Sequence, residues 1–384
     1  MLRQLSFAIA VAAVLTGCGS QVSGVPHAGE IDVRKLDVGA YDTDPLDVRY
    51  TYDNYYGGGE QLAMVRLADH IASSLDIDPR LKYGAGVSPM LPDGLDPAIL
   101  PAANWAAAKQ NNVLFGFGVS GADAKADATG AVTIFVLQFQ DEAAAARTAS
   151  EFEDTATTDR VQPLTLPKYP ATRAHSDDQS IGSTMAHGKY LISVAISVPN
   201  TDRAGLVRLA EQAYTAQIPL LDSLPALSRE DVLRLPSDPD DILRRTFNPD
   251  ALGDPYAGNQ ATYGALGFTN VFGIDRAHWR QVLADTGTDR IGLSDGSLLF
   301  RTRDDAAAHT LLPEPLSEVY TRPVDPPPGI PDGRCGEHTS ETDSRKRFRC
   351  TVEYRRYVAS VDSNQIADVY QRAAAAYAVL ANSQ

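Results

Sequence analysis

Two kinds of hydrophobic pattern recur along the chain, one typical of strands and one typical of helices. Residues 132–139 form a dense run of β-branched and aromatic side chains, which predicts a strand. Asp141 follows at a position suited to a helix N-cap. Beyond it, Ala145, Thr148 and Ala149 fall on one face of an alanine-rich segment. This stretch therefore predicts a strand, an acidic cap and an amphipathic helix.

The same design occurs again near residue 300. Residues 297–302 predict a strand, Asp304 an acidic cap, and the residues up to Leu312 a second alanine-rich helix. A tryptophan lies upstream of each unit, Trp105 in the first half and Trp279 in the second. The repeated order predicts an internal duplication.

Each half also closes with a second strand and a longer helix. Residues 190–198 predict a strand, and Thr201 or Asp202 caps the helix after it. In the second half, residues 347–361 predict a strand, and an amphipathic helix follows Ser363. The matching order extends the predicted duplication to the ends of both halves.

The predicted fold class is α+β with two related domains. Each domain is expected to be an antiparallel sheet with helices packed on one face, in a ferredoxin-like or similar arrangement. The expected boundaries are residues 46–232 for the first domain and 251–384 for the second. Prolines and charges interrupt the core pattern between them, so residues 233–250 are assigned to a linker.

The first residues have the parts of an export signal. Arg3 precedes an apolar run from Leu5 to Leu15, which is far shorter than the roughly 20 residues of a membrane-spanning helix. The run then ends in Leu15-Thr16-Gly17-Cys18. This ending predicts a signal peptide over residues 1–17 and a lipid on the thiol of Cys18. The alternative is an ordinary signal peptide that contains a cysteine.

Composition changes this picture in two ways. Residues 18–45 are rich in small and polar side chains, so a flexible tether is expected there. The formal net charge of −15 argues against binding to nucleic acid and against electrostatic adsorption to anionic lipid headgroups. Attachment to the membrane is therefore expected through the lipid and not through charge.

The two remaining cysteines, Cys335 and Cys350, lie in the second predicted domain. Export places them in an oxidising compartment, where this spacing favours a disulfide across a hairpin over a metal site or a redox site. In the chain-entropy model, closing a loop of this length stabilises the fold by about 3 kcal/mol.

Several stretches together resemble a family of uncharacterised actinobacterial lipoproteins. They are the Leu15-to-Cys18 lipobox, Val22 to Gly24, Glu30 to Tyr41, Arg66 to Ile71 and the cysteine-bearing C-terminal domain. The resemblance covers most of the chain and implies a lipoprotein on the outer face of the cytoplasmic membrane. It implies no reaction and no catalytic residues.

Few motifs indicate catalysis or a bound metal. Gly292 to Gly296 matches the G-x-S-x-G pattern, but Ser294 precedes a predicted strand, whereas the hydrolase motif needs a strand before it, which favours a turn. The acidic loop from Asp123 to Gly130 lacks the ligand spacing of a calcium loop and is expected to be a hairpin. No pair of histidines has metal-binding spacing, so neither a metal nor a cofactor is expected.

One basic stretch stands out against the acidic background. If residues 347–357 form one strand, Arg347, Arg349 and Arg355 share a face, with Tyr357 nearby. Such a row can bind a phosphate or carboxylate group of an envelope component. The alternative is a solvated strand face, or an edge that charge protects from self-pairing.

The sequence therefore predicts a lipid-anchored cell-envelope protein that binds a ligand or a protein partner. An envelope hydrolase acting on an ester or glycan, with Ser294 as its nucleophile, is the alternative. A structural or sensory module with its site between the two halves is the third hypothesis.

Overall fold

The structure is a computed structural model in which residues 31–47, 56–94, 100–152, 162–177, 179–250, 258–273, 275–317, 319–340 and 344–383 are described. The predicted signal peptide, Cys18 and the first part of the predicted tether lie outside these residues. Residues from Ile31 onward belong to one compact unit. None of the helices in these ranges is both long and apolar enough to cross a membrane.

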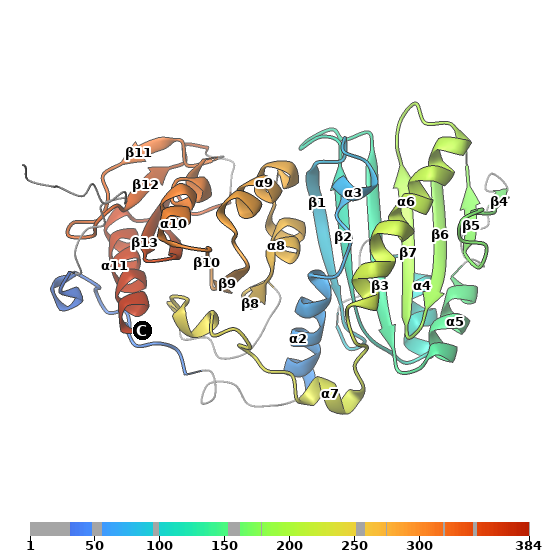
Figure 1. Cartoon of the computed structure of the whole chain (residues 1–384), viewed down its shortest axis with the longest axis horizontal. Coiled ribbons are helices and arrows are strands. Elements are labelled where there is room, and N and C mark those ends of the chain that lie inside the picture. The colour runs from blue at the N-terminus through green and yellow to red at the C-terminus, as the bar shows by residue number, and fades with distance from the viewer. Residues whose placement is uncertain are drawn as a thin grey trace, which may run out of the picture. The chain divides into compact units, whose positions relative to one another are not determined.

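The N-terminal domain is built on a seven-stranded antiparallel sheet with the order β1-β2-β3-β7-β6-β5-β4 (Figure 1). Its strands are β1 Tyr83–Met90, β2 Val113–Ala122, β3 Ala131–Phe139, β4 Gln162–Leu164, β5 Arg173–Ser176, β6 Ser180–His187 and β7 Tyr190–Ser197. Its helices are α2 Tyr56–Ala68, α3 Ser74–Ile77, α4 Ala102–Gln110, α5 Glu142–Glu151, α6 Arg203–Asp222 and α7 Arg229–Leu233.

The C-terminal domain has its own seven-stranded antiparallel sheet, in the order β11-β12-β13-β14-β10-β9-β8. Its strands are β8 Gln260–Tyr263, β9 Arg290–Ser294, β10 Ser297–Arg301, β11 Arg322–Val324, β12 Arg334–Glu337, β13 Phe348–Tyr354 and β14 Tyr357–Ser363. Its helices and 3₁₀ turns are η2 Leu243–Arg245, α8 Ala265–Phe272, α9 Arg276–Thr286, α10 Asp305–Leu311, η3 Glu314–Leu316 and α11 Ile366–Asn382.

The two sheets have the same strand order when the second is written from its other edge, as β8-β9-β10-β14-β13-β12-β11. β1 corresponds to β8, β3 to β10 and β7 to β14, and the helices α5 and α6 correspond to α10 and α11. The agreement reaches single residues, because each sheet carries an Arg-Thr-Ser row across three paired strands. The rows are Arg173, Thr184, Ser193 and Arg334, Thr351, Ser360. The predicted α+β class with an internal duplication is confirmed.

The predicted caps begin these helices. Asp141 accepts a hydrogen bond from the backbone N–H of Ala144, and Asp304 accepts one from Ala307. Asp202, and not Thr201, caps α6. Each cap satisfies a backbone donor that the first helical turn leaves without an internal partner.

Helices lie on both faces of each sheet, whereas the sequence analysis expected one covered face. In the N-terminal domain α2 and α6 pack on one face, and α4 and α5 pack on the other (Figure 1). In the C-terminal domain α11 covers one face and α10 lies on the other. The physical reason is visible in β2, which is buried at every position and therefore has no solvent-facing side.

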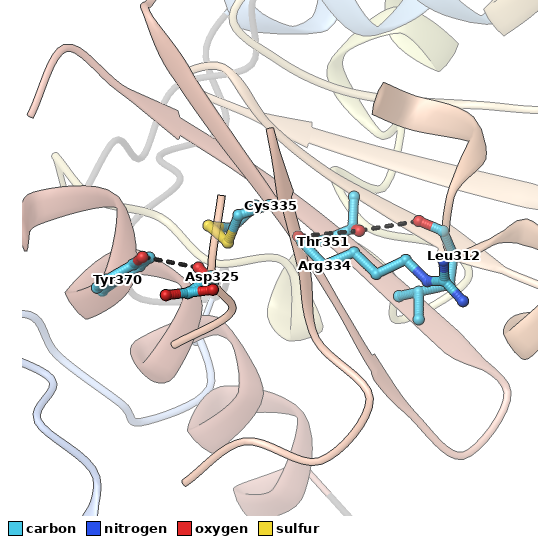
Figure 2. Close-up of a disulfide and its surroundings, with 7 residues drawn as sticks. Leu312, Asp325, Arg334, Cys335, Thr351 and Tyr370 are labelled. Atoms are coloured by element: carbon cyan, nitrogen blue, oxygen red, sulfur yellow. Dashed lines mark hydrogen bonds between the residues drawn. A yellow bond between two sulfur atoms is a disulfide. The ribbon is translucent and has the colours of Figure 1, made fainter. Parts of the chain in front are cut away.

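Cys335 and Cys350 form a disulfide between neighbouring positions of β12 and β13. Figure 2 shows it close to α11, where the Tyr370 hydroxyl donates to the carbonyl of Asp325 over 2.7 Å. Thr351, next to Cys350, donates its hydroxyl to the carbonyl of Leu312 (Figure 2). The disulfide therefore joins two strands that are also held by α11 and by the end of α10.

Residues 31–47 pack against the C-terminal domain, which corrects the predicted flexible tether for residues 31–45; residues 18–30 of that prediction lie outside the described residues. The 3₁₀ turn η1, Val33–Lys35, contacts α11. Tyr41 donates to Asp368 over 2.6 Å and its ring meets Phe247 edge-on. Five apolar side chains of this segment pack against the α11 core, and composition alone does not show this: Ile31, Val33, Leu36, Val38 and Tyr41.

The predicted linker 233–250 is also ordered. Asp238 accepts hydrogen bonds from the backbone N–H groups of residues 242, 243 and 244, which fixes the turn η2. Ile242 and Phe247 are buried in the core beneath α11. Ile242 and Phe247 are therefore part of the C-terminal core, whereas Leu235, at the start of the segment, packs against the core that contains α2 and α6.

The two domains meet through α2, β1, α8 and α9. Arg276 of α9 is completely buried and donates to the Ser74 hydroxyl and to the carbonyls of Ser120 and Asn270. Burial lowers the pKa of Arg276 to about 10, so the guanidinium stays charged at neutral pH. The amide of Asn270 donates in turn to the carbonyl of Ile71.

Candidate functional site

An aromatic cavity of about 280 Å³ lies in the C-terminal domain. It is formed by α8, α9, β10, the segment around η3 and the first part of β13. The residues around it are Phe268, Phe272, Trp279, Leu298, Phe300, Glu314, Pro315, Val319, Tyr320, Arg345 and Arg349. Its volume is at the lower end of the range of small-molecule sites, roughly 300–1,000 Å³.

Aromatic rings form the floor of this cavity. Phe268 meets Trp279 and Phe300 edge-on, with centroids 5.2 and 5.3 Å apart. Trp279 stacks parallel to Phe300 at 6.0 Å, and Phe272 stacks on Phe268 at 5.5 Å. These contacts hold each ring in place, so the cavity has a fixed apolar surface.

Charged side chains form the rim. Glu314 lies 2.9 Å from His278, at the N-terminal end of α9. Arg349 lies 3.0 Å from Asp362, and its guanidinium sits over the ring of Tyr320 at 4.6 Å. Arg345 lies at the same rim and is exposed. The site therefore combines an apolar floor with cations on one side.

The duplication shows what occupies the equivalent place in the N-terminal domain. The two domains can be aligned on the caps of α5 and α10. Leu298 lies six positions before the α10 cap, and Phe135 lies six positions before the α5 cap, so these two residues correspond. Phe135 is buried, together with Met90 from β1. Leu298 is only partly buried and lines the cavity. The same position is filled in one domain and open in the other.

A second cavity, of about 260 Å³, lies where the domains meet. The residues around it include Asp69 and His70, which follow α2 directly, and Asp240 and Arg290. Arg290 and Asp240 form an ion pair of 2.5 Å. Desolvation raises the pKa of Asp69, against the lowering effect of its hydrogen bonds to Gly264 and Gly267. The charged groups of this cavity therefore have partners already: Asp240 pairs with Arg290, and Asp69 accepts backbone hydrogen bonds from the other domain.

Comparison with known proteins places both domains in a single family. Residues 51–237 match the N-terminal domain of DUF7373, a domain of unknown function, and residues 242–383 match its C-terminal domain. The chain belongs to the DUF7373 family. No curated protein matches the sequence.

One solved structure similar to this DUF7373 chain is titled the extracellular domain of PknH from Mycobacterium tuberculosis. It is 9% identical, with a TM-score of 0.31, and the match covers 47% of this chain and 100% of that one.

The four residues of the predicted anion-binding face are divided between two ends of β13. Arg349 lines the aromatic cavity, and Arg347 pairs with Glu337 over 2.6 Å. Arg355 lies in the turn after β13, and Tyr357 begins β14. The strand ends at Tyr354, so the alternation that placed the three arginines on one face, with Tyr357 nearby, stops there.

Ser294 is the last residue of β9, in a hairpin whose turn is Asp295-Gly296. It is 1% exposed, and its hydroxyl has no hydrogen-bond partner among the described residues. The predicted turn is formed by the two residues after Ser294, whereas Ser294 itself ends β9, a strand that was not predicted to precede it. The strained strand-to-helix turn of a hydrolase nucleophile is not formed here.

The acidic loop and the histidines have structural roles. Asp123 accepts hydrogen bonds from the backbone N–H groups of Thr129 and Gly130 and closes the β2–β3 hairpin. His187 pairs with Asp222 over 2.7 Å. Within the described ranges no group of three His, Cys, Asp or Glu side chains is placed to hold a metal ion.

The sequence analysis missed most of the cavity. Phe268 and Phe272 are four positions apart on a helix, and this spacing was the available signal. Glu314 and Tyr320 come from a segment with no periodic pattern, so their approach to α9 and β13 could not be foreseen. Arg349 alone links the predicted face to the cavity.

Proposed function

We propose that this protein is a lipid-anchored protein of the cell envelope that binds a small ligand in the aromatic cavity of its C-terminal domain. The proposed anchor is a lipid on Cys18, as in the actinobacterial lipoproteins that the sequence resembles. The proposed place is the outer face of the cytoplasmic membrane. The ligand is a component of that compartment.

The observation that carries the proposal is the difference between Leu298 and Phe135. Each residue lies beside the tryptophan of its own domain, Phe135 near Trp105 and Leu298 near Trp279. In the N-terminal domain the Phe135 side chain is packed in the core, whereas in the C-terminal domain the equivalent position lines a cavity. Interiors are close-packed, and voids larger than a water molecule are few. An aromatic cavity that opens to a charged rim therefore fits a ligand site better than a packing defect.

The cavity supports binding more than catalysis. Its described lining includes Glu314, which lies 2.9 Å from His278 behind it, but no serine, threonine or cysteine that could act as a nucleophile. Ser294, the nucleophile of the alternative hydrolase hypothesis, is buried in a hairpin. We therefore favour binding without turnover.

Mass spectrometry of the protein purified from the membranes of its own host tests this proposal. Intact mass should show a diacyl or triacyl adduct on Cys18, and native mass should show a bound small molecule. Cys18→Ser should remove the acyl adduct, and Leu298→Phe should remove the small molecule while the acyl adduct stays. A native protein that carries neither adduct would contradict both parts of the proposal.

A further inference from the structure

We infer that the ligand of the aromatic cavity is a small apolar acid: a ring or short acyl chain that carries a single carboxylate or phosphate. This inference rests on the proposed function and specifies its ligand. It follows from two features of the cavity, the composition of the floor and the distribution of charge at the rim.

The floor selects an apolar group. Phe268, Trp279 and Phe300 contact one another through their rings, and Leu298 lies beside them. Flat ligand groups gain both apolar burial and favourable ring contacts on such a surface. A strongly polar body would lose its hydration there without compensating hydrogen bonds. A cavity of about 280 Å³ also limits the body to a small ring system or a short chain.

The rim selects an anionic head. On the acidic side, the Glu314 carboxylate lies 2.9 Å from Nε2 of His278. On the basic side, Arg349 is held by Asp362 at 3.0 Å and by the carbonyl of Pro315 at 3.4 Å. These two bonds engage two of the five N–H donors of a guanidinium. Arg345 adds a second cation at the exposed edge.

The position of Arg349 is fixed before a ligand arrives. Its guanidinium is stacked on Tyr320 at 4.6 Å, and the Tyr320 hydroxyl donates to the carbonyl of Lys346 over 3.0 Å. A cation held in this way loses little side-chain entropy when an anion binds. The sequence around it, Arg345 to Arg349, contains four basic residues in a protein of net charge −15, although Arg347 and Arg349 are each paired with a carboxylate. Basic side chains are therefore concentrated beside the cavity.

A matched series of probes tests the ligand class. Naphthoate, naphthyl methanol and naphthyl methylamine share one ring and carry a negative, neutral and positive head. Their affinities are measured by calorimetry on the full-length protein in a non-ionic detergent. Leu298→Phe, which introduces the residue found at the equivalent N-terminal position, serves as the blocked control and corrects for partitioning into micelles.

We expect naphthoate to bind at least about tenfold more tightly than the alcohol and the amine, the effect of one charge-assisted hydrogen bond. Arg345→Gln should reduce the affinity for naphthoate about fivefold or more and leave the alcohol unchanged. Arg355→Gln removes the same charge at the far end of β13, outside the cavity, and should change neither affinity.

Other outcomes overturn the inference in distinguishable ways. If the acid and the alcohol bind equally well and Leu298→Phe abolishes both, the ligand class is wrong and the binding site stands. If the amine binds more tightly than the acid, the inferred ligand class is likewise wrong, and the cavity remains the binding site. If no probe binds, the inferred class is wrong, and the small molecule in the native mass spectrum decides the proposed function separately.

Discussion

Asp69, at the end of α2 in the N-terminal domain, accepts hydrogen bonds of 2.9 and 2.8 Å from the backbone N–H groups of Gly264 and Gly267 in the C-terminal domain. Gly264 is the N-cap position of α8 and has no side chain to cap the helix. One domain thus supplies the cap for a helix of the other. The same helix carries Phe268 and Phe272 of the aromatic cavity.

Asp69→Ala should therefore weaken the contact between the domains. The backbone donors of Gly264 and Gly267 would lose their acceptor, and we expect a loss of about 1–2 kcal/mol in the free energy of unfolding. Chemical denaturation measures it. Asp76→Ala removes a carboxylate from an exposed pair with Arg280 and should cost less than about 1 kcal/mol. Equal losses in the two variants would contradict the capping role.

The same carboxylate predicts a pH dependence with a definite sign. Because desolvation raises the pKa of Asp69, the folded state binds its proton more tightly than the unfolded state does. This contribution to stability is complete below the unfolded pKa near 4 and is lost as the pH rises through the raised folded value. Arg290 and His70 face the group and oppose the shift, while Tyr263 packs beside it.

Asp69→Asn removes this titration and keeps the shape of the side chain. We expect the stability of the wild type relative to Asp69→Asn to increase when the pH is lowered from 7 towards 4. Denaturant unfolding at several pH values measures the difference. A constant difference across this range would show that the carboxyl titrates alike in the folded and unfolded states.

Arg276 makes a second test of the junction. Arg276→Ala removes hydrogen bonds to Ser74, Ser120 and Asn270 and leaves a buried cavity, so a loss of about 3 kcal/mol is expected. Arg280→Ala, on the same helix, removes only a half-exposed pair with Asp76 and should cost less than about 1 kcal/mol. Thermal unfolding compares them, and a separate transition for each domain should appear only in Arg276→Ala.

Arg355 has a positive φ of 51°, in the first position of the β13–β14 turn. The equivalent β6–β7 turn has Gly188 there, with a φ of 55°. Left-handed backbone is unfavourable for side chains with a Cβ. Arg355→Gly should therefore stabilise the protein by about 0.5–1 kcal/mol, and Gly188→Ala should destabilise it by a similar amount. A melting temperature lowered by Arg355→Gly would show that the contact of the guanidinium with the Tyr354 ring outweighs the backbone strain.

The disulfide predicts an effect confined to one domain. Cys335→Ala with Cys350→Ala releases the loop between β12 and β13 and should lower the free energy of unfolding by about 3 kcal/mol. At the positions of the N-terminal sheet that correspond to Cys335 and Cys350, Ala174 lies opposite Ser183, so that sheet has no disulfide there. Hydrogen exchange should therefore become faster in β12 and β13 and stay unchanged in β5 and β6.

Local patterns predicted the repeated units well. The strand, cap and helix after residue 132 are present at the expected positions, and so is the second copy capped by Asp304. These elements depend on short-range chemistry, namely apolar runs and side-chain caps. The order of the strands in each sheet depends on long-range pairing, and only the repetition itself indicated that both sheets share one order.

Long-range packing explains the failures. The segment around Tyr41 resembles a tether because its apolar residues are few, yet each finds a place against α11. The sequence predicts one strand through Arg355 because the two-residue turn Arg355-Arg356 contains no glycine or asparagine that would indicate a hairpin. The aromatic cavity draws on helices and strands from different parts of the C-terminal domain, and no local pattern brings them together.

The contact of Ile31 and Val33 with the core beneath α11 sets a limit on distance. Only twelve residues separate Cys18 from Ile31, and an extended chain of this length reaches no more than about 45 Å. If Cys18 carries the lipid, the segment between Cys18 and Ile31 connects the lipid to the C-terminal domain, although that domain comes last in the sequence. The anchor would then be joined to the domain that carries the aromatic cavity, and not to the domain that comes first in the sequence.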